Sequence, residues 1–390
     1  MNRFFRQMAA IVTAAFFCTL ITHNHSAFAA EQPETYRVIL TVRSGQNAAF
    51  ITELDIQSSE ITRALNSAKQ ETISDPSYMP DIDVSLLQNN KRIHFHLEPT
   101  GNLWNESTSQ RLVLTKKASD KLLQLADSLR AHHYGKMIPW ESAAHMVPKK
   151  SIFSVTDLGT GLTFLVQRRA GKDHADVQPV TKEDTRIMKQ IYHDGWSWKR
   201  KAVLVHSGDE WIAASMNGMP HGGDGIPGNG FSGHFCIHFY LSSTHKSELP
   251  DLTHQIMVHK AAGNLRPFFD SASPLILAKS FVEVMNHQDQ ELLQQVAEGL
   301  SKEKFAYFAQ EMESLGSIRE KKQSRTSGAD DEAFEDSLSA EIRLPITIHK
   351  QSHAERHTDY RFIFKRESKQ SPWRIQDILT DKDKMDPKAL

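Results

Sequence analysis

The sequence predicts a mixed α+β protein of three parts, with a mostly β part in the middle. Residues 136–268 hold short alternating segments separated by glycine-containing turns, which is typical of β-structure. The flanking stretches contain apolar residues at helical spacing, and three more alternating segments follow near the C-terminus. We therefore expect a secretory signal at 1–30, a small α+β module at 31–135, a β-rich domain at 136–268 and a helices-then-sheet domain at 269–390.

The composition excludes several classes of protein. The 390 residues include 46 Lys and Arg and 47 Asp and Glu, which gives a net charge of -1. Because no basic excess is present, we expect no nucleic acid or anionic membrane surface as a partner. Apolar residues at 39% and charged residues at 24% are typical of a folded chain, so disorder and a multi-span membrane architecture are not supported. The sequence predicts no particular oligomeric state.

The N-terminus predicts export. Arg3 and Arg6 precede an apolar run at 8–22, and the sequence Ala-Phe-Ala-Ala at 27–30 contains a small-x-small cleavage site of the signal-peptidase type. The apolar run is shorter than the roughly 20 residues that a membrane-spanning helix needs. We expect cleavage, a secreted or cell-wall-associated protein and no integral membrane span. Removal of Cys18 with the signal leaves Cys236 alone, so a stabilising disulfide is excluded.

Before the β-rich part, alternation predicts strands at 36–43 and 91–98. The stretch between them is polar and compatible with helix up to about residue 70. Residues 118–131 carry leucines and alanines at helical spacing, which predicts an amphipathic helix.

Within the β-rich part, two hairpins are predicted. Residues 151–158 and 162–169 flank a Gly-Thr-Gly turn, and residues 202–206 and 211–215 flank a Ser-Gly-Asp-Glu turn. A helix is expected at 181–192, between the hairpins.

From Pro274 onward the pattern changes to helix, with further helices expected at 291–300 and 302–315. A charged run at 319–336 has no apolar period and predicts a solvated loop. Strands are expected at 341–349, 359–365 and 373–379. This order of helices followed by an antiparallel sheet resembles the NTF2-like (cystatin-like) fold over about 110 residues.

The chemistry-bearing residues gather around Cys236. If residues 234–241 form a strand, its period of two places four apolar residues on one face and three polar residues with Cys236 on the other. The apolar face would hold Phe235, Ile237, Phe239 and Leu241, and the other face His234, Cys236, His238 and Tyr240. Two imidazoles then flank a thiol, an arrangement that favours a reactive cysteine held as thiolate.

A glycine-dense loop leads to this strand. Six glycines lie between His221 and His234, so the loop can turn sharply and bring backbone N–H groups to a substrate. Such groups form an oxyanion hole in acyl transfer. We expect the oxyanion site at Gly222, Ser232 and Gly233. The same loop can carry His221 back over the cysteine, where it would act as a base.

These residues resemble the active-site signature of the L,D-transpeptidases (YkuD-like). A His-Gly pair at 221–222, a glycine-rich gap of 14 residues and the run SGHFCIH at 232–238 carry the resemblance. It implies a β-rich catalytic domain, Cys236 as nucleophile, His221 as base, peptidoglycan stem peptides as substrate and no cofactor or metal. His234 or His238 would orient and polarise the pair.

The sequence departs from that signature at two points. Phe235 stands where the family has glycine, and Ser232-Gly233 lies one position further upstream. Both changes touch the expected oxyanion site, so transfer, hydrolysis and loss of activity stay open.

A zinc-dependent hydrolase and a noncatalytic cell-wall-binding protein are the alternatives. Available zinc ligands are His221, His234, Cys236, His238, His245 and His254. No His-Glu-x-x-His motif is present, and His254 lies five residues from His259, which places the two on different helix faces. For His174 and Asp176 we favour a turn over a functional pair, and for Trp196 and Trp198 buried packing over a substrate groove.

Overall fold

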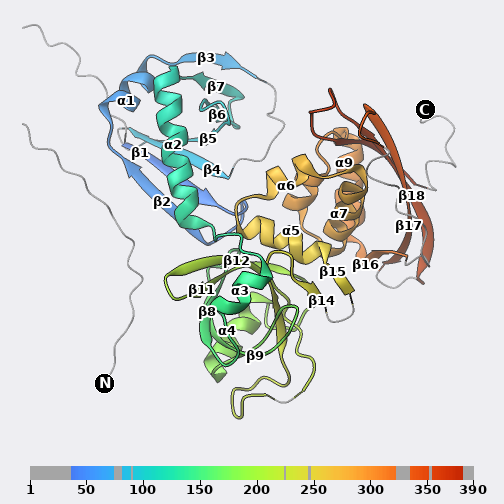
Figure 1. The fold of residues 1–390 in the computed structure, drawn as a ribbon. Helices are drawn as coiled ribbons and strands as arrows, with labels where there is room; N and C mark the ends of the chain where they lie inside the picture. The colour runs from blue at the N-terminus through green and yellow to red at the C-terminus, as the bar shows by residue number, and fades with distance from the viewer. Residues whose placement is uncertain are drawn as a thin grey trace, which may run out of the picture. The chain divides into compact units, whose positions relative to one another are not determined.

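The computed structural model describes residues 37–73, 81–88, 91–223, 225–244, 247–321, 334–350 and 354–380 (Figure 1). The chain forms two compact units. The first takes the described residues up to 42 and those within 52–75 and 82–129, and the second takes the described residues within 43–51, 76–81 and 130–390. The predicted signal segment lies outside the described residues. Within the described ranges, no helix combines the length and apolarity needed to cross a membrane.

The first unit is built on one antiparallel sheet. Its strands are β1 (Arg37–Arg43), β2 (Ile51–Ile56), β3 (Lys69–Thr72), β4 (Ile82–Gln88), β5 (Lys91–Leu97), β6 (Leu103–Asn105) and β7 (Gln110–Val113), in the order β2-β1-β4-β5-β6-β7-β3. Helix α1 (Ser59–Asn66) and helix α2 (Lys116–His133) accompany them, and α2 confirms the amphipathic helix, since Leu122 and Ala126 are fully buried. The helical interpretation of the stretch up to residue 70 was wrong in part, because β2 and β3 flank α1.

A closed barrel forms the first part of the second unit. Its strands are β8 (Ile152–Asp157), β9 (Thr163–Ala170), β10 (Ala175–Pro179), β11 (Lys201–Ser207), β12 (Glu210–Met216) and β13 (Phe235–His238), closed in the order β10-β13-β12-β11-β8-β9. The two predicted hairpins are confirmed as β8–β9 and β11–β12. Helix α3 (Trp140–Met146) precedes the barrel. Helix α4 (Lys182–Ile191) confirms the helix predicted at 181–192, and it begins at a capping box of Thr181 and Asp184.

Strand β13 is shorter than predicted. Phe235, Ile237 and Phe239 do enter the barrel core, as the period of two predicts. The strand nevertheless ends at His238, because Phe239 and Ser242 bond to each other in a turn. Leu241 therefore lies outside the core, 53% exposed and with a φ of 60°.

Helices and a second sheet complete this unit. The short strands β14 (Ser243–Thr244) and β15 (Ser247–Pro250) lead into α5 (Leu252–Ala261), α6 (Leu265–Ser271), α7 (Pro274–His287), α8 (Gln290–Val296) and α9 (Lys302–Glu313). An antiparallel meander follows, formed by β16 (Leu315–Glu320), β17 (Ser339–Lys350), β18 (Arg356–Lys365) and β19 (Arg374–Leu379). The three predicted helices and three predicted strands are confirmed. The predicted charged loop begins inside β16, and its residues 322–333 lie outside the described part.

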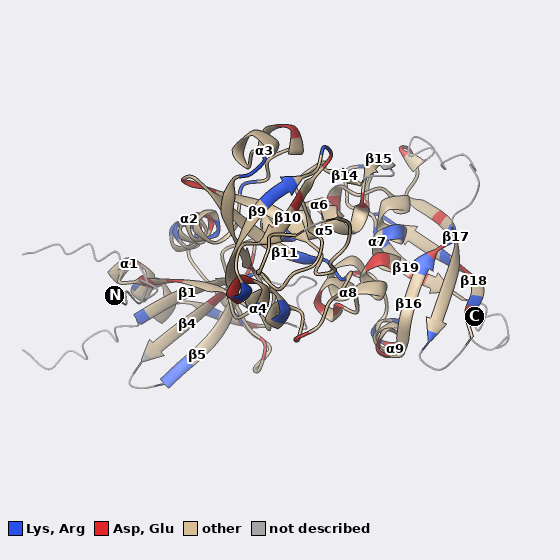
Figure 2. Ribbon diagram, turned by 90° about the horizontal axis from the view of Figure 1, so that it is seen from below, with Lys and Arg blue, Asp and Glu red and all other residues tan. Residues whose placement is uncertain are grey.

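One hydrophobic core joins the outer face of the barrel to the helices of this unit. Leu204 and Ala213 of the barrel belong to the same buried cluster as Ile256 of α5 and Phe281 of α7. Basic and acidic segments are interspersed over the elements (Figure 2), in keeping with the balanced net charge. Overall, the described chain is mixed α+β, as the sequence predicts.

Candidate active site

Cys236 lies on β13, between β10 and β12 in the barrel wall. Since Phe235 and Ile237 point into the barrel, Cys236 and His238 point to the other face. Helix α5 covers this face, because the His254 ring stacks on the His238 ring at 3.7 Å. The Cys236 side chain is consequently buried, with 5% of its surface exposed.

The structure brings His221 and Cys236 together. The backbones of His221 and His234 exchange two hydrogen bonds, of 2.9 and 2.7 Å, and this bridge returns the loop to the start of β13. Nε2 of His221 lies 3.2 Å from Sγ of Cys236. Nδ1 of His221 lies 2.8 Å from the carbonyl oxygen of Met219. Because a carbonyl only accepts, Nδ1 carries a hydrogen, and in the neutral ring the lone pair of Nε2 faces the thiol.

Glycine is required at two points of this loop. Gly233 has a φ of 85°, and a Cβ there would lie 2.5 Å from the carbonyl oxygen of His221. Gly222 has a φ of 72°, and a Cβ there would lie 2.3 Å from the His234 ring. Any side chain at either position would push the two histidine segments apart. Both glycines therefore help to hold His221 against the sulfur.

Gln178 fixes the loop from the barrel. Its side chain is fully buried on β10, donates to the carbonyl oxygen of Gly233 and accepts from the N–H of Ile226 at 2.5 Å. One amide thus satisfies two loop backbone groups that would otherwise be buried without partners.

Asp176 belongs to the candidate site, although the sequence analysis favoured a turn over a functional pair for it. It lies directly opposite Cys236 in the β10–β13 pairing, so the two side chains share a face. Its Oδ1 lies 3.8 Å from Sγ, 3.1 Å from Nε2 of His174 and 3.8 Å from Nε2 of His234. The interpretation of His174 and Asp176 as a turn is wrong, since His174 directly precedes β10 and Asp176 is inside it. The alternation of Ala175 and Val177 with polar residues, bounded by a glycine and a proline, was the available signal.

The surroundings keep the thiol protonated at rest. Burial first, and then the carboxylate of Asp176, raise the pKa of Cys236 above its ordinary value. The expectation of a preformed thiolate is therefore replaced by a neutral thiol that faces a base.

A stack of buried imidazoles lies on the same face. His238 stacks on His174 at 4.3 Å and on His254 at 3.7 Å between ring centroids. Burial lowers the pKa of His254 far below its ordinary value, so this ring is neutral, and its Nδ1 lies 2.9 Å from Oγ of Ser215. His238 is thus part of the packed interior, whereas His221 and His234 are both partly exposed.

Two sets of side chains could hold a metal ion. Within the described residues, the ligand atoms of His221, His234 and Cys236 lie within 4.8 Å of one another, as do those of His174, Cys236 and His238. Both sets contain the same sulfur, and imidazole with thiolate is a donor set that suits zinc. His254 belongs to neither set, and His245 lies outside the described residues.

Trp198 borders the exposed side of the site. Its ring lies 5.1 Å from the His221 ring and is 50% exposed, so the buried packing expected for it was wrong. Trp196 does pack on the barrel core, edge-on against Phe231. Of the expected oxyanion residues, Gly233 is buried, whereas Gly222 and Ser232 are exposed.

Comparisons with known proteins give no assignment. No protein-family model matches the chain, and no curated protein matches it.

Proposed function

We propose that this protein is an exported cysteine acyl-transfer enzyme that acts on peptidoglycan stem peptides. The single observation that carries the proposal is the contact of 3.2 Å between Nε2 of His221 and Sγ of Cys236, with Nδ1 bonded to the Met219 carbonyl. A neutral imidazole in this tautomer is a general base aimed at a nucleophile. The substrate class rests on the resemblance of residues 221–238 to the L,D-transpeptidases.

Catalysis would begin with attack of Sγ on a stem-peptide carbonyl carbon at an L-to-D centre. The thiol proton moves to Nε2 of His221, and the oxyanion is held by loop N–H groups, with Gly233 the best candidate. The C–N bond then breaks, and the leaving amine takes the proton from Nε2. The product of this half-reaction is a thioester on Cys236.

A stem amine or water would resolve the thioester. The acceptor gives a proton to Nε2 of His221 as it attacks, the C–S bond breaks, and the sulfur takes the proton back. An amine acceptor makes the reaction a transpeptidation, and water makes it a hydrolysis.

The raised pKa of the thiol fits this sequence of steps. A thiol that is neutral at rest is weakly nucleophilic and resists oxidation. It becomes nucleophilic when His221 removes its proton during attack, so base and nucleophile act as one unit.

For the fold, we propose that the barrel and α4 form a divergent L,D-transpeptidase-like domain and that α7 to β19 form an NTF2-like domain. The order of three helices before a four-stranded antiparallel meander supports the second assignment. The described residues of the first unit would form the small N-terminal module of the three-part organisation.

Intact-protein mass spectrometry after incubation with muropeptides tests the proposal. We expect a mass adduct on the wild-type protein that is absent from Cys236→Ala and strongly reduced in His221→Gln. His206→Gln is a matched control, because His206 packs on Trp211 of the β11–β12 hairpin and contacts neither Cys236 nor His221 in the described structure. No adduct on wild-type protein that is folded and alkylatable at Cys236 contradicts the proposal.

A zinc-dependent hydrolase is the second candidate, favoured by the two sets of ligand atoms around Cys236. It predicts one zinc per chain in protein purified without chelator and activity that a chelator abolishes. The cysteine enzyme predicts activity that a thiol alkylator abolishes and a chelator leaves unchanged. A noncatalytic wall-binding protein predicts that Cys236→Ala still sediments with sacculi while the muropeptide profile stays the same.

A further inference from the structure

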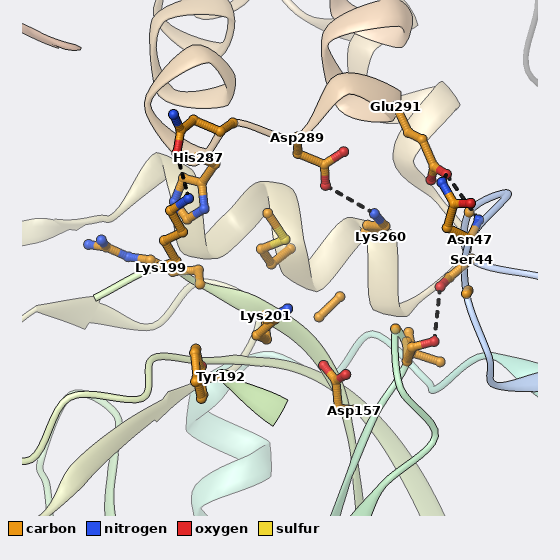
Figure 3. Close-up of a pocket in the computed structure, with 18 of the residues that line it drawn as sticks. Ser44, Asn47, Asp157, Tyr192, Lys199, Lys201, Lys260, His287, Asp289 and Glu291 are labelled. Carbon is orange, nitrogen blue, oxygen red and sulfur yellow. Dashed lines mark hydrogen bonds and ion pairs between the residues drawn. The ribbon is translucent and has the colours of Figure 1, made fainter. Parts of the chain in front are cut away.

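A second site lies in a cavity of about 610 Å³ within the second unit (Figure 3). Its walls come from the loop at 44–48, the end of β8, the segment 197–202 before and within β11, helix α5 and the α7–α8 junction. Neither Cys236 nor His221 lines it. This volume is in the range of sites for small molecules.

One end of the cavity is positively charged. Lys201 has no carboxylate partner in the described part of the chain, and its ammonium lies over the Tyr192 ring, 5.9 Å from the ring centre. Lys199 donates to the neutral side chain of Gln288 at 2.8 Å. Burial and the charge of Lys201 lower the pKa of Lys199. Two ammonium groups therefore lie near each other without a neutralising anion.

The positive charge at this end of the cavity also affects His287. It is 8% exposed at the end of α7, beside Lys199 in Figure 3. Burial, followed by the positive charges of Arg200, Lys199 and Lys201, lowers its pKa to about 3, although Asp289 acts in the opposite direction. A neutral imidazole at this end can donate to an anion without adding to the repulsion between the lysines.

The opposite end offers hydrogen-bond acceptors. Glu291 accepts from the backbone and side-chain N–H groups of Asn47 at 3.2 and 3.3 Å and has no cation partner in the described structure. Asp157 is 1% exposed and points toward the cavity in Figure 3. Its Oδ2 accepts twice from Thr160, whereas its Oδ1 has no hydrogen-bond donor among the described residues. These carboxylates repel an anion and accept from hydroxyl groups.

The two ends together select the ligand. Ammonium groups are point charges that suit a tetrahedral phosphate, and the forked guanidinium of Arg200 is already engaged by the Trp198 carbonyl and Asp251. A hydroxyl-bearing body fits between the phosphate and the acceptors. From this geometry we infer that the cavity binds a small phosphorylated sugar or polyol, with its phosphate between Lys199 and Lys201 and its hydroxyls toward Asp157 and Glu291.

The wall of this cavity continues into the candidate active site. Trp198 precedes Lys199 directly and places its ring against His221. Ser197 accepts from the backbone N–H of Gly218, close to Met219. An occupant that moves Lys199 would therefore also act on the segment that borders His221.

Isothermal titration of the full chain tests the inference. The probes are inorganic phosphate, glucose 6-phosphate and glucose. We expect glucose 6-phosphate to bind more tightly than phosphate, and glucose to give no saturable heat. Binding of both phosphates should weaken as NaCl rises, because free charges attract the ligand.

Single variants locate the binding. Lys199→Met and Lys201→Met should each weaken glucose 6-phosphate at least tenfold. Glu291→Gln should weaken glucose 6-phosphate but not inorganic phosphate, which should bind as tightly as before or more tightly because a repelling charge is gone. Lys172→Met, at an exposed lysine of the same unit, is the matched control and should bind normally. Thermal melting checks that each variant is folded.

Three results would overturn the inference: no saturable binding of either phosphate up to about 10 mM, affinities unchanged in both lysine variants, or glucose that binds as tightly as its phosphate. Cys236→Ala should bind the phosphates normally. This site is therefore tested independently of the proposed acyl transfer.

Discussion

Replacing Asp176 by asparagine should make the thiol of Cys236 easier to ionise. The carboxylate Oδ1 lies 3.8 Å from Sγ across the β10–β13 pair, and its charge opposes a negative charge on the sulfur. Asparagine has nearly the same shape, so the substitution removes the charge and keeps the packing.

The magnitude follows from the distance. At about 4 Å a unit charge opposes the thiolate by about 1 kcal/mol at the dielectric constant of water and by about 4 kcal/mol at an effective value of 20. The polar rings of His174 and His234, with Nε2 atoms at 3.1 and 3.8 Å from Oδ1, partly screen this charge. We therefore take the lower part of the range, about 1.4 kcal/mol, or one pKa unit. At pH 7 this is about a tenfold increase in thiolate.

The assay is the rate of alkylation of the folded protein by iodoacetamide, followed by mass spectrometry from pH 6 to pH 10. Asp176→Asn should react about tenfold faster at pH 7 and at every pH at which the thiol of both proteins is still mostly protonated. Asp209→Asn, at an exposed position in the β11–β12 turn, should react as wild type.

A second variant separates electrostatics from loosening of the structure. His174→Gln removes the ring that offsets the carboxylate, so its Cys236 should react no faster than wild type. Loosening would accelerate both variants alike. An Asp176→Asn protein that reacts at the wild-type rate throughout this pH range refutes the reasoning.

Three further predictions concern stability. Gly233→Ala should lower the free energy of unfolding in denaturant by about 2 kcal/mol or more, because its Cβ would meet the His221 carbonyl at a positive φ. Gly223→Ala is the control and should be near neutral, since a Cβ there meets nothing within 4 Å. Equal losses of stability in the two variants would contradict the geometry. Gln178→Met should lower the free energy of unfolding by about 1–3 kcal/mol, because two backbone groups of the loop lose their hydrogen-bond partner. Gln190→Met, at an exposed position, should change stability little. A Gln178→Met protein with wild-type stability and an unchanged Cys236 alkylation rate would disprove the role of Gln178 in fixing the loop. His287 has a folded pKa of about 3 against about 6.5 unfolded, so its stabilisation is full above pH 6.5 and is lost as pH falls toward 3, by up to about 5 kcal/mol. In His287→Gln the unfolding midpoint should fall less between pH 7 and pH 4 than in wild type, whereas in exposed His145→Gln it should fall as in wild type. The same pH dependence in wild type and His287→Gln would show that His287 does not cause this loss of stability.

The sequence was most informative where local rules apply. Turn residues predicted both hairpins, and the helices expected from residue 181 and from Pro274 begin within one residue of those positions, each after a capping side chain. The approach of His221 to Cys236 could be expected from the sequence, because the six glycines between His221 and His234 allow the loop to turn sharply and return to the strand.

What the sequence left out depends on pairing between distant strands. Asp176 is 60 residues from Cys236, and only the register of β10 against β13 makes them neighbours. The early end of β13 depends on the Ser242 hydroxyl, which bonds the Phe239 N–H, and the period of two carries no sign of this competition. Burial of the thiol under α5 is likewise a tertiary property, so its raised pKa could not be expected from flanking histidines.

The position of the sulfur on a strand rather than on a loop has a mechanical consequence. A backbone paired on both sides, with β10 and β12, holds Sγ nearly stationary, so in the proposed reaction the substrate carbonyl must be brought to the sulfur. A carbonyl carbon can come to about 3–3.5 Å from Sγ only if it is carried by a narrow chain that fits between the Trp198 indole and the partly exposed rings of His221 and His234. Size, more than intrinsic reactivity, then decides which electrophiles this cysteine meets: a methyl thiosulfonate should label it readily while a bulky maleimide is turned away.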